Sequence, residues 1–75
     1  MDDYKPHINI RAMDETELRK FCRLLGFGVI EEDIAVYKII ERLKGTEIRQ
    51  IMGYSHSEYY RRLNKIKSYP EFRHI

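Results

Sequence analysis

The sequence contains no tryptophan, a single cysteine, and no apolar run close to the roughly 20 residues that a membrane-spanning helix requires. Cys22 cannot form an internal disulfide, and its place in a helical apolar stripe predicts a buried core thiol. The acidic start at residues 1–3 is not followed by the apolar segment of a secretory leader. We therefore expect a cytoplasmic protein without a membrane segment.

Residues that carry catalytic or metal chemistry are also sparse. The candidate metal ligands have none of the paired spacings of zinc sites; they are His7, His56, His74 and Cys22. No grouping of Ser, His and Asp and no glycine-rich phosphate loop is evident. The acids at 31–33 are explained by a helix start, where the macrodipole favours negative charge. We expect no enzyme, no metal and no cofactor.

Charge is unevenly distributed along the 75 residues, which can form one domain, 1–75. Up to Asp33 the net charge is −3, with five Lys and Arg against eight Asp and Glu. From Ile34 onward it is +5, with nine bases against four acids. A basic face in this second half would attract phosphate.

Hydrophobic residues recur with helical spacing in two segments of the first half. Asp14 and Glu17 form a capping-box pattern and Gly26 supplies a helix end, so we predict a helix over 14–25. Its apolar stripe is Leu18, Phe21, Cys22 and Leu25. A second helix, central in the core, is predicted over 30–44, with acids in its first turn and a lysine in its last. Its stripe is Val36, Ile39, Ile40 and Leu43.

The N-terminal arm, 1–13, has a different pattern. It contains Pro6 and a brief alternation of apolar and polar residues around Ile8 and Ile10, which predicts a short extended segment. Such a segment either packs on the helices or pairs with its copy in a second subunit.

The stretch 45–64 predicts a helix, a three-residue turn and a second helix. Thr46 is a suitable N-cap for the first helix. Its apolar positions are Ile48, Ile51 and Met52. Gly53 ends this helix, because it adopts a positive φ without a Cβ penalty. Ser55 and Glu58 form a capping-box pattern, so the next helix starts near Ser55.

The last predicted helix, 55–68, ends before Pro70, which cannot continue it. The helical core therefore covers 14–69 and leaves a tail, 70–75. We expect Phe72 and Ile75 of the tail to pack back on the core. The predicted fold is all-α, a small domain of three to four helices with an N-terminal extended arm.

The stretch 46–65 resembles the helix-turn-helix of DNA-binding regulators, in particular bacterial sigma-factor region 4 and small phage or mobile-element regulators. The matching positions are Ile48 and Met52 in the first helix, Gly53 and Tyr54 in the turn, Ser55 as cap, and Tyr59, Tyr60, Arg61, Arg62 and Leu63 in the second helix. Arg49 departs from the family pattern, which has a small residue packed against the second helix. Its side chain must extend outward or loosen that packing.

The resemblance implies that the second motif helix enters the major groove while the first crosses the DNA backbone. Backbone N–H groups and a serine at the start of the second helix would hold a phosphate. An exposed arginine suits bidentate contact with guanine, worth about 1–3 kcal/mol of discrimination, and an asparagine suits adenine. The candidate DNA-binding residues are Ser55, His56, Ser57, Tyr60, Arg61, Arg62, Asn64 and Lys65. Of these, His56, Ser57, Tyr60 and Arg61 are the base-contacting candidates. Arg62, Lys65 and Lys67 are the phosphate-neutralising ones.

The first hypothesis is sequence-specific binding of double-stranded DNA by a small transcriptional regulator or excisionase-like factor, associated with the nucleoid of a bacterial, archaeal or viral-host cell. One recognition helix offers a small contact area, so we expect a homodimer. The candidate dimer surfaces are the arm, through Tyr4, Ile8 and Ile10, or the tail, through Phe72 and Ile75.

Two alternatives remain open from the sequence. The same helices could form a protein-interaction module, for instance a phage- or plasmid-type inhibitor that uses its acidic N-terminal half. Exposed tyrosines could instead bind single-stranded RNA. Duplex DNA binding would weaken steeply with added salt, which separates these hypotheses.

Overall fold

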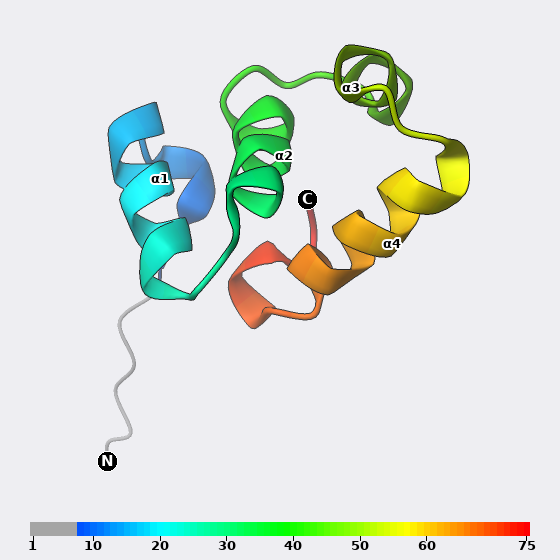
Figure 1. Cartoon of the computed structure of the whole chain (residues 1–75). Coiled ribbons are helices and arrows are strands. Elements are labelled where there is room, and N and C mark those ends of the chain that lie inside the picture. Colours follow the sequence, from blue (N-terminus) through cyan, green and yellow to red (C-terminus); the bar gives the residue numbers. More distant parts are fainter. Residues whose placement is uncertain (1–7) are drawn as a thin grey trace.

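Four α-helices and two short 3-10 helices make up the regular structure of residues 8–75, the part of the chain that this computed structural model describes (Figure 1). The elements are η1 (Ile10–Ala12), α1 (Glu15–Leu24), α2 (Val29–Ile39), α3 (Gly45–Met52), α4 (His56–Lys67) and η2 (Pro70–Phe72). This range contains no strand, and none of its helices is long and apolar enough to cross a bilayer. The predicted small all-α fold is confirmed.

Helix α2 is the central element, because it packs against α1, α3 and α4. Its core positions are Ile34, Ala35, Val36 and Ile39. The other elements complete the same cluster with Ile10, Leu18, Cys22, Ile48, Tyr59, Leu63, Ile66 and Phe72. Burial raises the pKa of the Cys22 thiol to about 11, so this cysteine is a protonated core residue at neutral pH.

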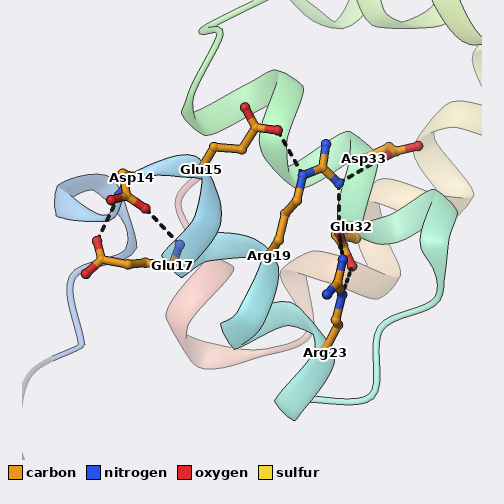
Figure 2. Close-up of polar contacts among 7 residues, drawn as sticks. All are labelled: Asp14, Glu15, Glu17, Arg19, Arg23, Glu32 and Asp33. Carbon is orange, nitrogen blue, oxygen red and sulfur yellow. Dashed lines mark hydrogen bonds and ion pairs between the residues drawn. The ribbon is translucent and has the colours of Figure 1, made fainter.

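Helix α1 forms almost as its sequence predicts. The Glu17 carboxylate accepts the Asp14 backbone N–H at 3.0 Å, and Asp14 accepts the Glu17 N–H at 2.8 Å, which completes the capping box (Figure 2). At the other end Gly26 has φ +84°, and the N–H of Phe27 donates to the Cys22 carbonyl at 3.0 Å. This 6→1 bond closes the helix in a Schellman motif.

Helix α2 ends at Ile39, so the prediction that it extends to residue 44 was wrong. Arg42 adopts a left-handed conformation, φ +57°, and the following N–H, that of Leu43, donates to the Tyr37 carbonyl at 2.9 Å. The chain thereby turns back over the end of the helix. Leu43 still packs against the core. Ile39 before the turn and Leu43 after it both contact the core, so their four-residue spacing looks helical although a turn separates them.

An ionic cluster joins α1 to α2 (Figure 2). Arg19 contacts Glu32 at 2.7 Å and Asp33 at 3.2 Å, and it also pairs with Glu15 on its own helix at 2.9 Å. Arg23 contacts the other oxygen of Glu32 at 3.2 Å. The helix-start explanation of the acids at 31–33 is therefore incomplete, because Glu32 and Asp33 connect α2 to α1 and Glu31 connects it to α4.

Glu32 is the centre of this cluster and is only 5% exposed. Burial by itself raises the pKa of a carboxyl group. The hydrogen bonds from Arg19 and Arg23 outweigh that effect, and the pKa of Glu32 is lowered overall. The hydrogen bonds of Arg19 to Glu32, Glu15 and Asp33 raise the pKa of Arg19, so Arg19 and Glu32 are both ionised at neutral pH.

The described part of the N-terminal arm is a 3-10 turn, not the predicted extended segment. The Asn9 side chain accepts the Arg11 backbone N–H at 3.1 Å and caps this turn. Ile10 is 4% exposed, and the Arg11 guanidinium donates to the His74 carbonyl at 2.9 Å, so the arm packs against the tail. Tyr4 lies outside the described residues.

The tail packs back on the core as predicted, with Phe72 fully buried and Ile75 half-buried. The Phe72 ring lies 5.2 Å from that of Phe27 and 6.0 Å from that of Phe21, centroid to centroid. Of the residues named for the expected dimer surfaces, Ile10 and Phe72 belong to the core of their own chain. Ile8 alone of the described candidates is exposed.

Candidate functional site

Helices α3 and α4 are joined by the turn 53–55 and pack against each other (Figure 1). Gly53 has φ +70°, and the N–H of Tyr54 donates to the Arg49 carbonyl at 3.0 Å, so α3, like α1, ends with a 6→1 bond around a left-handed glycine. The predicted role of Gly53 is confirmed. Backbone hydrogen bonds therefore fix the path of the chain from the end of α3 into the turn.

The start of α3 differs from the prediction. Thr46 is not the N-cap, because the helix begins at Gly45 with Lys44 in the cap position. The Glu47 carboxylate accepts the Lys44 backbone N–H at 2.8 Å. A Cβ atom on Gly45 would lie 3.1 Å from the Tyr59 ring, so this glycine allows α3 to approach α4 closely.

At the start of α4, one of the two hydrogen bonds of the predicted capping box is formed. The Ser55 hydroxyl accepts the Glu58 backbone N–H at 3.2 Å. The reciprocal bond is not formed, because the Glu58 carboxylate pairs with two arginines farther along the helix. Those contacts, with Arg61 and Arg62, lower the pKa of Glu58 and keep it ionised.

One face of α4 is core and the other is exposed. Tyr59, Leu63 and Ile66 are buried, as their spacing predicts. The Tyr59 hydroxyl has no hydrogen-bond partner in the described structure, and burial raises its pKa. Seven of the eight candidate residues are exposed: Ser55, His56, Ser57, Tyr60, Arg61, Asn64 and Lys65. We call these seven residues the outer face of α4.

Two aromatic rings lie side by side at the N-terminal end of the outer face. The centroids of His56 and Tyr60 are 4.5 Å apart, and Tyr60 also makes an edge contact with the buried Tyr59 at 5.1 Å. Tyr60 remains 43% exposed. It is thus fixed on one side and open to solvent on the other.

Arg61 and Arg62 are adjacent in sequence and have different surroundings. The Arg61 side chain is 71% exposed, and its one ion pair, with Glu58 at 2.6 Å, lies on the same helix. That contact raises the pKa of Arg61, which is cationic at any physiological pH. The Arg61 charge therefore lies at the surface, and Glu58 is its one ion-pair partner in the described structure.

Arg62 is only 27% exposed and makes three contacts. It pairs with Glu58 at 2.7 Å and with Glu31 of α2 at 3.5 Å, and its guanidinium lies 5.3 Å from the centre of the Tyr54 ring. It thereby connects α4 to α2 and to the turn. Arg62 is three residues from Tyr59 and four from Ile66, so it lies on the same side of the helix as these buried residues. This spacing is the sequence signal that Arg62 contacts the rest of the fold.

A hollow of about 190 Å³ lies beside α3 and the turn, and the sequence analysis did not predict it. Its walls are Thr46, Arg49, Gln50, Gly53 and Tyr54. Arg49 is half-buried, and its Nε–H has no acceptor in the described structure. The helical spacing of Thr46, Gln50 and Gly53 is the signal that these residues share one side of α3.

Comparisons with known proteins add no family assignment. No family model, no curated protein and no solved structure matches this chain. Within residues 8–75, no group of three or more His, Cys, Asp and Glu side chains is arranged to hold a metal ion.

Proposed function

We propose that this protein binds double-stranded DNA sequence-specifically by placing the outer face of α4 in the major groove. The observation that carries the proposal is this exposed polar and basic face, on a helix whose opposite side is fixed in the core and whose entry is set by the turn 53–55. The major groove of B-DNA is wide enough to admit an α-helix that presents such a face. The resemblance to helix-turn-helix regulators points to the same docking geometry.

The outer-face residues have separate roles in this proposal. Arg61 exchanges Glu58 for the O6 and N7 atoms of a guanine, and Glu58 keeps its second partner, Arg62. Tyr60 offers an exposed ring edge to a thymine methyl group or a base.

Phosphate contacts come from both ends of the helix. The backbone N–H groups behind Ser55 lie at the positive end of the α4 dipole, and Lys65 and Lys67 lie in its last turn. Arg62 acts as a positioning residue, because its charge is shared between two carboxylates within the fold.

The regulator or excisionase-like role requires a second contact with DNA. A single module of this size buries about 600–1,000 Å² on DNA, so we propose a homodimer on two half-sites. The symmetry of the preferred DNA sequence reports on this directly, because a two-fold dimer selects a palindrome.

The charge arrangement favours DNA over the protein-interaction alternative. An inhibitor that uses acidic residues of the N-terminal half needs them exposed and unpaired. Glu32 is buried between Arg19 and Arg23, Asp33 also contacts Arg19, and Glu31 contacts Arg62. The acids of α2 are therefore largely neutralised within the fold.

The test is selection of bound sequences from random duplex DNA at low salt, followed by binding of the selected site by two variants. Arg61→Ala removes the exposed base contact while leaving the core untouched, and we expect about a 10-fold to 100-fold loss of affinity. Lys20→Ala, an exposed change on α1, is the matched control and retains binding. Absence of duplex binding by the wild type at low salt would end the proposal, and preference for single strands would favour RNA.

A further inference from the structure

The five arginines within α-helices differ in how their charge is compensated. Arg19, Arg23, Arg61 and Arg62 each contact at least one carboxylate within 3.5 Å. Arg49 is the exception among these five, because within residues 8–75 it has no ion pair and its Nε–H lacks an acceptor. A half-buried guanidinium without a counter-ion is unusual, because its desolvation is not offset by an attractive partner.

The surroundings of Arg49 offer a place for such a partner. The hollow of about 190 Å³ that it lines is open to solvent and has no acidic residue in its wall. Thr46 and Gln50 add a hydroxyl and an amide, both of which can donate hydrogen bonds. One cation and neutral donors around an open space favour an oxyanion, and the planar guanidinium fork suits a phosphate group.

The backbone holds this site in place. The Arg49 carbonyl accepts the N–H groups of both Gly53 and Tyr54, so the residue that carries the charge also closes the helix. The Tyr54 ring forms another wall and has the Arg62 guanidinium on it. The hollow therefore lies at the start of α4, because its wall residue Tyr54 directly precedes the Ser55 cap.

We propose that this hollow binds a phosphate group through Arg49, with Thr46 and Gln50 as additional donors. The inference rests on the proposed function for its source, which is a backbone phosphate of the DNA that α4 contacts. A phosphate held there sets the position of the DNA strand at the entry of α4 and carries no base specificity. Arg49 is thus a phosphate-binding residue on the first motif helix.

The first experiment measures the affinity for mixed-sequence duplex DNA over a range of salt concentrations. Loss of one phosphate contact lowers the slope of log K against log salt by about 0.9. We expect this decrease for Arg49→Gln, with an equal loss of affinity on selected and unrelated duplexes. Arg49→Lys keeps the charge and the slope. Lys20→Gln, the matched loss of one exposed positive charge on α1, leaves the slope at its wild-type value.

The second experiment needs no DNA. Inorganic phosphate is titrated into the wild type, with chloride at equal ionic strength as control, and the Arg49 Nε–H resonance is followed by NMR. A shift with phosphate alone supports the site. Thermal unfolding of each variant checks that the fold is retained.

The outcomes separate this inference from the proposed function. If the wild type binds duplex DNA and Arg49→Gln leaves the slope unchanged, the DNA phosphate contact is overturned while the function stands. If the wild type does not bind duplex DNA, the function fails. The phosphate titration then decides alone, and an unchanged Arg49 resonance overturns the hollow as an anion site.

Discussion

The arginines of α1 extend across to acids of α2, whereas those of α3 and α4 are arranged differently. Arg61 pairs only within its own helix, Arg49 has no carboxylate partner in the described structure, and Arg62 alone connects α4 to α2. In the helix pair α1–α2, charge stabilises the fold. In the pair α3–α4, Arg49 and Arg61 have no carboxylate partner on another helix of the described structure, and the net charge of +2 does not reveal this difference.

The largest expected effect comes from removing the cation that compensates Glu32. Arg19→Met leaves the buried carboxylate with Arg23 alone, whose side chain is 68% exposed. We expect a loss of about 2–3 kcal/mol in the free energy of unfolding, measured by urea denaturation. Arg61→Met is the matched change in the other helix pair, and its urea midpoint should stay near the wild-type value because its ion pair is exposed. Equal shifts in both variants would contradict the contrast between the two pairs.

The two left-handed glycines provide a second comparison. Gly26 and Gly53 have φ near +84° and +70°, and no atom lies within 4 Å of a Cβ added at either position. Alanine at each site should therefore cost a similar amount, about 1–2 kcal/mol, through the backbone alone. Under conditions where both variants are folded, Gly53→Ala should weaken duplex binding and Gly26→Ala should not. A loss of duplex binding in both variants would show that the turn 53–55 is no more important for DNA binding than the end of α1.

Acid should weaken the α1–α2 contact in a predictable way. The pKa of Glu32 is lower in the folded state than its ordinary value of 4.5. The folded carboxylate therefore binds a proton less readily than the unfolded one, and stability present above about pH 4.5 is lost as the pH falls through the folded-state pKa. In Glu32→Gln, the free energy of unfolding should decline less steeply with acid. Glu58→Gln should change the pH dependence less, because that carboxylate is more exposed, 29% against 7% for the Glu32 side chain.

The smallest effect is expected in the core beneath α3. The Tyr59 hydroxyl is buried without a partner, so Tyr59→Phe removes an unsatisfied group and keeps the ring that Gly45 approaches. The free energy of unfolding should stay the same or rise by up to about 1 kcal/mol. Tyr69→Phe should lower it slightly, because that hydroxyl donates to the Leu25 carbonyl at 3.4 Å. A clear loss of stability in Tyr59→Phe would indicate a partner for its hydroxyl.

Local signals predicted much of the fold. The Asp14 capping box, the left-handed Gly26 and Gly53, and the Ser55 cap depend on residues within one or two turns of each other, and each is confirmed. The 3.6-residue period also identified the buried side of α4. These features are encoded where they occur in the chain.

Features that depend on another element were not predicted. Arg42 takes the left-handed position at the end of α2 although it is not a glycine, and Leu43 continues the apolar spacing past the turn. Periodicity cannot separate a helix from a turn that returns to the same core. The early start of α3, in contrast, is a local feature that the sequence analysis missed, because the Glu47 carboxylate accepts the Lys44 backbone N–H three residues before it.

The candidate site shows the same division. The period of α4 predicted which residues are exposed, and seven of the eight are. It could not separate the partners of Arg61 from those of Arg62, because Glu31 comes from a different helix. The hollow at Arg49 was not predicted, although Arg49 departs from the family pattern and the spacing of Thr46, Gln50 and Gly53 places them on one side of α3.

The separation of adjacent Arg61 and Arg62 has a consequence for how this surface can change. Arg62 holds α4 to α2, while Ser57, Arg61, Asn64 and Lys65 are exposed and have no side-chain hydrogen bond or ion pair to another helix in the described structure. Substitutions at these four positions should be largely independent of the fold. A library randomised there would yield folded proteins with altered surface chemistry, so the chain could acquire new binding preferences without first acquiring new stability.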